Sequence, residues 1–342
     1  MSYMWKILRV DLSAGKISEE KLDEKLARDF IGGRGLGSKY LYDEIDPTVD
    51  PLSPENKLIF ATGSLTGTVA PTGGRYMVIT KSPLTGLIAS SNSGGFFGPE
   101  IKFAGYDMLI VEGRADHPVY IRIRDNDVEI KDASHLWGKP VSETTKILLE
   151  ELGDPKAQVA CIGPAGENKV LYASVMNDKR AAGRTGMGAV MGSKNLKGIA
   201  VRANVKNKIE IADPHAFKEL LHKYIKNINK DMVVSAFSQM GTVSGMSMGM
   251  IIGDVPIKNW TKGKFKTKKI DAKAIGKINI KTPTCFACNV HCHRWIKLNG
   301  YEGKGPEYET VAAFGTLIMN GELEPIIEAN NKCNELGIAT IS

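Results

Sequence analysis

The sequence has no uninterrupted apolar run of the length that a membrane-spanning helix requires. Its most apolar window, residues 232–253, is broken by Ser, Thr, Gln and Gly, whereas a spanning helix needs about 20 predominantly apolar residues. The N-terminus also lacks the charged start and the apolar stretch of a secretory leader. These absences exclude a membrane span, and we expect a cytoplasmic protein.

Cysteine is scarce, and its number is odd. The 342 residues include five cysteines, three of them within eight positions. A secreted disulfide scaffold normally has an even number of cysteines and is much shorter. The cysteine usage therefore argues against such a scaffold and predicts metal or redox chemistry. Cys161 and Cys333 lie apart from the group and are predicted to be inert core residues.

Aromatic residues make up only 7% of the chain, and few of them accompany its densest run of positive charge. Residues 260–281 are rich in lysine and contribute much of the formal net charge of +7. Binders of single-stranded nucleic acid interleave aromatic residues with basic ones. We therefore expect a solvated surface rather than a nucleic-acid site, and such a surface can also receive an acidic protein partner.

Short apolar runs dominate the first two hundred residues. Residues 5–17 and 119–133 alternate as hairpins do, and the second hairpin is predicted to turn at Asn126 and Asp127. One clear helix interrupts the runs, with Ser142 as its cap and Gly153 at its end. Because strands do not alternate with helices, the pattern disfavours a doubly wound nucleotide fold and favours two packed sheets.

The apolar period changes from two to 3.6 after about residue 208. Asp213 and Pro214 suit the cap and first turn of a helix whose apolar residues form one stripe over residues 217–228. A further helix is predicted from Pro325 to Gly337. The sequence thus predicts an α+β protein with a β-rich domain over residues 1–208 and a mainly α-helical domain over residues 209–342.

Three cysteines and two histidines share one short loop: Cys285, Cys288, Cys292, His291 and His293. Thiolates at CxxCxxxC spacing hold zinc or an iron-sulfur cluster. Zinc would take a histidine as its fourth ligand, although structural zinc usually pairs a CxxC with a second, distant pair. Three local cysteines and a distant fourth are typical of a cluster. The spacing favours iron-sulfur, with zinc and buried structural thiols as alternatives.

Four Gly-rich stretches, residues 32–37, 70–76, 90–98 and 180–198, are predicted to be loops. Gly lets the backbone approach a ligand closely, and the exposed N-H groups of such loops attract phosphate. The last stretch adds four cations: Arg180, Arg184, Lys194 and Lys197. None of the stretches matches the GxxxxGK[ST] phosphate loop. Together they predict a site for a large anionic cofactor.

Long ordered segments carry a family resemblance: "LIFATGSLTGTVAPTGGRYMVITKSPLTG", "NSGGFFGPEIKFAGYDMLIVEGRA", "MNDKRAAGRTGMGAVMGSKNLK", "PTCFACNVHC" and "GPEYET". They resemble the tungsten-dependent aldehyde:ferredoxin oxidoreductases, and the resemblance covers the whole chain. It implies a base of two β-sheets beneath a tungsten bis-pterin cofactor (tungstopterin, with molybdenum as the alternative metal), with helical domains above. It also implies magnesium bridging the pterin phosphates.

The resemblance assigns roles to particular residues. Arg75 matches the arginine that touches both pterin and cluster, and Glu309 matches the active-site glutamate. The remaining pterin contacts that it implies are Asn92, Gly94, Arg180, Ala181, Gly183, Arg184 and Asn334. The cluster becomes a 4Fe-4S cluster with three ligands in this chain: Cys285, Cys288 and Cys292.

The implied activity is oxidation of a small aldehyde to a carboxylic acid, with electrons passing through the cluster to ferredoxin or another iron-sulfur protein. A homodimer is a further expectation. One alternative is the catalytic subunit of a related low-potential reductase acting on an acid or an aromatic thioester. Another is an inactive N-terminal fragment, because family members continue past the position of Ser342 and carry the fourth cluster cysteine there.

Overall fold

The structure is a computed structural model that describes residues 2–178, 180–204 and 209–342. The chain divides into two compact units. The first consists of Met1–Pro214 with Glu335–Ala339, and the second of His215–Asn334 with Thr340–Ser342. The domain boundary predicted at residue 208 lies outside the described residues.

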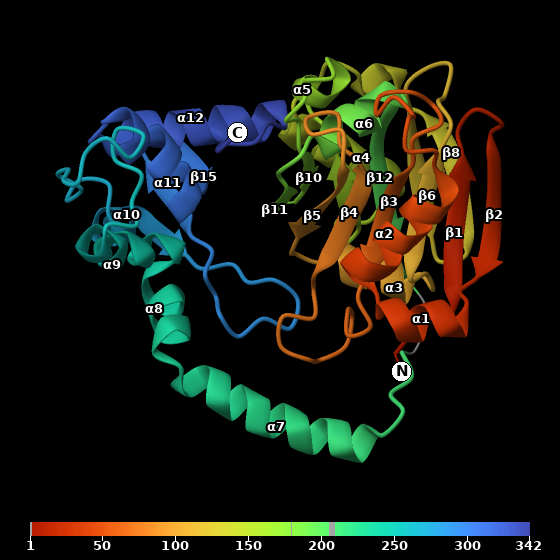
Figure 1. Ribbon diagram of the computed structural model, residues 1–342, viewed down its shortest axis with the longest axis horizontal. Coiled ribbons are helices and arrows are strands. Elements are labelled where there is room, and N and C mark those ends of the chain that lie inside the picture. Colours follow the sequence, from red (N-terminus) through yellow and green to blue (C-terminus); the bar gives the residue numbers. More distant parts are fainter. Residues whose placement is uncertain (1, 179, 205–208) are drawn as a thin grey trace. The chain divides into compact units, whose positions relative to one another are not determined.

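The first unit contains two six-stranded mixed sheets (Figure 1). One has the order β2-β1-β6-β3-β4-β5 and is formed by β1 (Lys6–Asp11), β2 (Lys16–Lys21), β3 (Leu58–Thr62), β4 (Tyr76–Lys81), β5 (Ile88–Ser93) and β6 (Met108–Glu112). The other has the order β11-β10-β9-β12-β7-β8 and is formed by β7 (Val119–Arg124), β8 (Asp127–Asp132), β9 (Gln158–Cys161), β10 (Val175–Asn177), β11 (Arg180–Ala182) and β12 (Leu196–Arg202). In the first sheet only β1 and β6 pair in parallel, and in the second only β7 and β12 do.

A shared core joins the two sheets, so the predicted two-sheet base is confirmed. Leu8 and Tyr76 of one sheet and Ile121 and Ile199 of the other belong to the same buried cluster. Helices cover the outer faces: α2 (Gly33–Glu44) packs on the first sheet and α4 (Val141–Leu152) on the second. Both faces of each sheet are therefore buried, which explains the near-continuous apolar runs of strands such as β3 and β6.

Helices are more numerous in the first unit than the sequence predicted. Besides α2 and α4, it contains α1 (Glu24–Phe30), α3 (Phe97–Phe103), α5 (Pro164–Glu167) and α6 (Met187–Ser193). Three of the four predicted Gly-rich loops in fact hold regular structure. Residues 33–37 open α2, residues 90–98 contribute to β5 and α3, and residues 180–198 contribute to β11, α6 and β12. Their glycines mask the helical and strand periods because they add no apolar side chain.

Two local predictions need correction by one or two residues. The β7–β8 hairpin turns at Asp125 and Asn126, since Arg124 pairs with Asp127, and the positive φ of Asp125 (54°) supplies the turn. Helix α4 begins after Pro140, and Ser142 lies inside it, where the hydroxyl donates to Glu335 rather than capping the helix. Its predicted end is confirmed, because Gly153 is left-handed at φ 64°.

The segment Glu335–Ala339 completes the first unit from far along the chain. Ile338 forms a β-bridge with Ala173, and the N-H of Ser174 donates to Gly337 O at 2.8 Å. Gly337 has φ 70°, and a Cβ there would lie 2.8 Å from Gly163 N. The positive φ and this close approach both require Gly at the turn.

The second unit is mainly helical, with a small antiparallel sheet of order β13-β14-β15. Its elements are α7 (Pro214–Lys230), α8 (Met232–Met240), α9 (Gly245–Ile252), α10 (Ala272–Ile278), β13 (Asn279–Lys281), β14 (Trp295–Leu298), β15 (Tyr301–Lys304), α11 (Tyr308–Phe314) and α12 (Leu323–Leu336). Helix α12 starts two residues before the predicted Pro325. The core of the second unit includes Val243, Ile275, Ile296, Val311 and Ile326. Within the described residues, no helix has the length and apolar content to cross a membrane.

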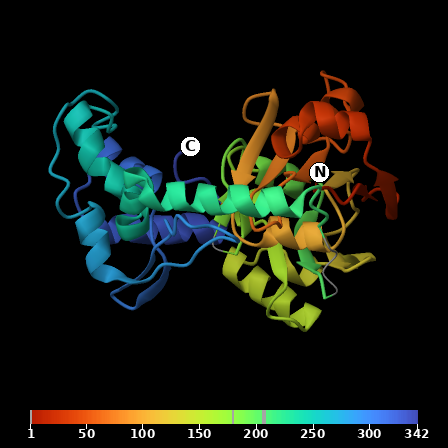
Figure 2. The ribbon, with the colours of Figure 1, turned by 90° about the horizontal axis from the view of Figure 1, so that it is seen from below.

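Helix α7 has the predicted start and stripe, yet none of its residues is buried. Leu220 is 60% exposed and Tyr224 is 58% exposed. Figure 2 shows α7 as one long, straight helix. An amphipathic stripe therefore predicts helix formation well but does not by itself predict what covers the helix.

Candidate functional site

A cavity of about 520 Å³ opens at one end of the first sheet. Glycines from three chain segments line it, together with two arginines: Gly32, Gly33, Gly63, Gly73, Arg34 and Arg75. Both arginine side chains are exposed. The cavity thus combines accessible backbone with positive charge, as the Gly-rich stretches predicted for a large anionic ligand.

Glycine is required where these segments meet. Gly32 has φ 148°, and a Cβ there would lie 3.2 Å from Ser64 N and 3.3 Å from Gly63 Cα. The start of α2 and the turn after β3 therefore touch backbone to backbone. A side chain at Gly32 would force the two segments apart and change the shape of the cavity.

Arg75 lies directly before β4 and interacts with the neighbouring strand β5. Its Nη1 donates to Asn92 Oδ1, and Asn92 stands opposite Met77 in the β4–β5 ladder. Thr66 Oγ1 donates to Arg75 O at 2.7 Å, which ties the turn after β3 to the residue that precedes β4. Two predicted pterin residues, Arg75 and Asn92, are thus in direct contact.

Asn177, which the sequence analysis missed, organises the interior beside this pair. It is buried, and its Oδ1 accepts hydrogen bonds from Tyr76 Oη at 2.9 Å and from Ser93 Oγ. Its Nδ2 donates to Gly94 O at 2.9 Å. Asn177 therefore joins β4, β5 and the turn at Gly94 to β10 of the other sheet. These three partners of the Asn177 side chain lie more than 80 residues away in sequence, so no local pattern could have identified Asn177.

The remaining predicted residues of the first unit lie beside the same strands. Arg180 and Ala181 form the edge strand β11, and a Cβ on Gly95 would come within 3.4 Å of Arg180 Cγ. The N-H of Arg184 donates to Ser91 Oγ at 3.2 Å, and Gly183 O accepts from Ser174 Oγ at 3.0 Å. Seven of the eight predicted pterin residues thus belong to the first unit, whereas Asn334 lies in α12 and belongs to the second.

Lys194 and Lys197 do not serve as ligands for an anion. Both side chains are fully buried. Lys194 Nζ donates to Pro54 O, Asn56 O and Gly113 O, and burial lowers the pKa of Lys194 to about 7. Lys197 pairs with Glu167. Both lysines therefore stabilise loops internally, and the predicted positive charge of this stretch is reduced to Arg180 and Arg184.

The cysteine triplet lies in the second unit, in the loop between β13 and β14 (residues 282–294). The N-H of Cys288 donates to Cys285 O at 3.2 Å, and Thr284 Oγ1 donates to Cys288 O at 2.9 Å. The three cysteines are half-buried, and no disulfide joins any of the five cysteines, all of which are described. Across the described part of the chain, no three His, Cys, Asp or Glu side chains are gathered as metal ligands.

Arg294 fixes the end of this loop. It is 5% exposed, and its Nη1 donates to His291 O and His293 O at 2.9 Å each. Its Nη2 donates to Phe237 O at 3.2 Å and Ser238 O at 2.7 Å, near the C-terminus of α8. Burial lowers the pKa of Arg294. A buried cation whose hydrogen bonds run to backbone carbonyls thus joins α8 to the chain around Cys292.

Behind the loop, His293 is buried and its Nδ1 lies 3.4 Å from Glu307 Oε1. Burial raises the pKa of Glu307, but hydrogen bonds from His293 and Thr242 and the charge of Lys304 outweigh it, so the pKa falls to about 2. Glu309, the predicted catalytic residue, is exposed in the first turn of α11. Its side chain is thus accessible at the surface of the second unit.

Comparison with protein families divides the chain into nearly the same two parts as the compact units of the fold. Residues 7–203 match the aldehyde ferredoxin oxidoreductase N-terminal domain, and residues 219–342 match domains 2 and 3 of the same enzyme family. The chain belongs to the aldehyde ferredoxin oxidoreductase family. The family resemblance inferred from the quoted segments is therefore confirmed.

Individual relatives in the aldehyde ferredoxin oxidoreductase family are similar over nearly the whole chain. The chain is 52% identical to the tungsten-containing aldehyde ferredoxin oxidoreductase of Pyrococcus horikoshii over 345 residues, which cover 99% of the chain and 56% of the relative. It is 48% identical to that of Pyrococcus furiosus, again with 56% of the relative covered. The chain thus spans little more than half the length of these relatives.

Among solved structures, the chain is similar to the active-site complex BamBC of benzoyl coenzyme A reductase, determined with 1,5-dienoyl-CoA. The TM-score is 0.88 at 33% identity, over 100% of this chain and 54% of the other. The α+β architecture with two mixed sheets is therefore that of the aldehyde ferredoxin oxidoreductase family.

The residues of this family member fit the expected cofactors by their chemistry. The cavity at Arg75 offers guanidinium, amide and backbone groups, which suit the phosphates and polar ring edges of a pterin. The three thiols of the cysteine loop suit the iron atoms of an iron-sulfur cluster. Arg75 and Asn92 are already in contact, whereas the three cysteine thiols would have to move closer together to bind one cluster.

Proposed function

We propose that this protein takes part in the oxidation of aldehydes to carboxylic acids at a tungsten bis-pterin centre, with electrons leaving through a 4Fe-4S cluster to ferredoxin. The observation that carries the proposal is the Arg75–Asn92 pair at the rim of a glycine-lined cavity. The 52% identity of the chain to a tungsten-containing aldehyde ferredoxin oxidoreductase supports the same proposal independently.

The first unit would hold the pterin. Arg75, Arg180 and Arg184 supply positive charge for the phosphates, and charge-assisted hydrogen bonds of this kind are stronger than neutral ones. Asn92 offers an amide that can both donate and accept at a ring edge. Because Asn177 fixes the turn at Gly94 in advance, little ordering would be needed when the cofactor binds.

The second unit would hold the cluster through Cys285, Cys288 and Cys292. Thiolates are the ligands of iron-sulfur clusters, and half-buried cysteines limit access of water to such a centre. When bound, the tungstopterin supplies a two-electron acceptor for the aldehyde, and the cluster carries single electrons onward. Glu309 would orient or deprotonate the attacking water, since an ionised carboxylate can accept that proton.

Metal analysis of protein purified without oxygen from tungstate-supplied cells tests this proposal. We expect tungsten and about four irons per chain, the content of one 4Fe-4S cluster. Aldehyde-dependent reduction of a viologen dye should accompany the metals. Zinc as the only metal, or tungsten bound without any reaction of the protein with an aldehyde, would contradict the proposal.

A pair of variants locates the pterin. Asn92→Ala removes the amide that Arg75 contacts and should lower the pterin content, measured by the fluorescence of the oxidised pterin. The control Asn168→Ala removes an exposed amide that donates to Pro164 O one turn earlier, and it should leave the pterin content unchanged. Equal pterin in both variants would place the pterin elsewhere.

The similarity to the benzoyl coenzyme A reductase complex favours one second candidate, reduction of an aromatic thioester at low potential. The two functions differ in the direction of electron flow. Protein that reduces a viologen with an aldehyde, and is not oxidised by an aromatic acyl thioester when pre-reduced, is an aldehyde oxidoreductase. The opposite result would support the reductase.

A further inference from the structure

The lysine segment, residues 260–281, is the most strongly charged stretch of the second unit. It contains eight lysines and one acidic residue, Asp271. Every one of the eight lysines is exposed. Asp271 is occupied as the cap of α10, where it accepts from the N-H of Ala274 at 3.0 Å.

The local structure directs these lysines outward. Between residues 264 and 268 exposure alternates along the chain: Lys264, Lys266 and Lys268 are exposed, while the intervening Phe265 packs against the core of the unit. The three ammonium groups therefore all lie at the surface of the unit. The segment is thus anchored on one side and positively charged on the other.

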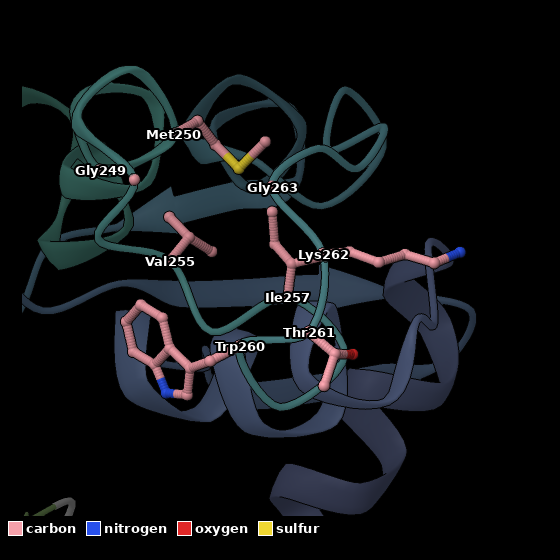
Figure 3. A pocket seen from close by; sticks show the side chains of 9 residues that line it. Gly249, Met250, Val255, Ile257, Trp260, Thr261, Lys262 and Gly263 are labelled. Atoms are coloured by element: carbon pink, nitrogen blue, oxygen red, sulfur yellow. The ribbon is translucent and has the colours of Figure 1, made fainter.

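Helix α10 continues the pattern. Lys273 and Lys277 are four residues apart and exposed, whereas Ala272 and Ile275 are buried on the opposite side. Residues at this spacing lie on the same face of a helix. Near the start of the segment, Met250, Trp260 and Lys262 line a cavity, and the end of the Lys262 side chain points outward from it (Figure 3).

Little negative charge offsets the segment. Lys269 pairs with Glu322 at 2.6 Å. Among the residues that the structure describes, the other seven lysines have no carboxylate oxygen within 4.0 Å. The segment therefore presents a field that attracts an acidic surface.

The segment leads directly into the cysteine loop. Lys281 ends β13, four residues before Cys285. Its Nζ lies 4.9 Å from the centroid of the Trp295 ring. Trp295 begins β14 on the other side of the loop. The positive charge thus reaches both ends of the loop that carries the three thiols.

We propose that the lysine segment is the docking surface for the electron acceptor, a small iron-sulfur protein with an acidic face. The inference rests on the proposed function, because it requires a cluster at Cys285, Cys288 and Cys292. In each encounter one electron leaves the reduced protein and reduces the acceptor by one electron. Charge complementarity steers such a partner to the loop and speeds association. A nucleic acid is disfavoured because exposed aromatics do not alternate with these lysines.

A charge reversal tests the docking surface. The triple variant Lys264→Glu, Lys266→Glu, Lys268→Glu is compared with a matched control on α7, Lys218→Glu, Lys223→Glu, Lys226→Glu, whose lysines are also exposed. With the holoenzyme and an acidic ferredoxin, kcat/KM for the ferredoxin should fall about tenfold or more in the first variant. It should stay within about twofold in the control, because those charges lie outside the segment. The rate with a viologen dye should be unchanged in both.

A binding measurement separates this inference from the proposed function. Calorimetric titration of ferredoxin requires no turnover, and it should show salt-sensitive binding that the first triple variant loses. Protein that binds ferredoxin in this way but oxidises no aldehyde would refute the proposed function and leave the docking surface intact. Unchanged ferredoxin binding in the first variant would overturn the docking surface. So would equal losses in the control, or tighter binding of polyuridylate or phosphatidylglycerol vesicles than of ferredoxin.

Discussion

The two candidate cofactor regions differ in how much of the protein holds them in place. The rim of the cavity stands on paired strands, and the buried Asn177 joins Tyr76, Ser93 and Gly94 behind it. The cysteine loop is irregular, and Arg294 is its main internal support. A pterin is recognised through hydrogen bonds that must be aimed in advance, whereas a metal cluster forms strong bonds that can gather its own ligands.

The largest effect is expected in the cysteine loop. Cys288→Ser removes one of three thiolates and should abolish cluster binding, seen as iron and acid-labile sulfide at background levels. The control Cys333→Ser alters a half-buried cysteine of α12 and should leave the iron content unchanged. Full iron content in Cys288→Ser would show that this loop does not hold the cluster.

The support of the loop can be removed separately. Arg294→Met removes four hydrogen bonds to backbone carbonyls, and at about 1 kcal/mol each the free energy of unfolding should fall by roughly 4 kcal/mol. Denaturant unfolding measures this loss. Lys297→Met, an exposed neighbour on β14, is the control and should change stability by less than about 0.5 kcal/mol. Equal effects would mean that Arg294 does not hold the loop.

The rim should be sensitive to its buried amide. Asn177→Ala removes three hydrogen bonds among buried groups and should lower the free energy of unfolding by roughly 3 kcal/mol. The pterin content should fall with it, because the turn at Gly94 loses its anchor. A variant that is destabilised but keeps its full pterin content would show that the rim does not depend on this support.

The smallest effect is a pH dependence behind the cysteine loop. The folded pKa of Glu307 is about 2, below the usual value of about 4.3 for an unfolded glutamate. Such a carboxyl stabilises the fold above pH 4.3 and loses that contribution as the pH falls towards 2. Wild-type protein should be more stable than Glu307→Gln at pH 7, and the two should converge below pH 4. A constant difference across this range would contradict the assignment.

Much of the architecture follows from local patterns. Alternating runs predicted both hairpins, short apolar runs predicted strands such as β3, β4 and β6, and Gly153 and Gly337 marked the ends of two helices. The helices α2 and α6 escaped prediction because both contain more than one glycine, and Gly37 and Gly192 among them pack too closely for a side chain. Burial on both sheet faces, by contrast, depends on contacts between distant segments.

The candidate site residues also divide into those that local sequence predicts and those that depend on distant contacts. Cys285, Cys288 and Cys292 could be predicted as ligands from the residues alone, because their spacing lies within one loop. Arg75 and Asn92 needed a family resemblance, since 17 residues separate them and only the β4–β5 register brings them together. Lys194 and Lys197 were misjudged because sequence shows charge but not burial.

The return of Glu335–Ala339 to the first unit has a consequence for the order of synthesis. The N-H of Ser174 donates to Gly337 O at 2.8 Å, and Tyr172 O accepts from the N-H of Ala339 at 3.3 Å. On the ribosome, about 5–20 residues are added each second, so the first unit waits on the order of 10 s after residue 214 before its last segment exists. Residues His215–Asn334 of the second unit are synthesised during that interval, so the first unit cannot finish folding until nearly all of the second has been made.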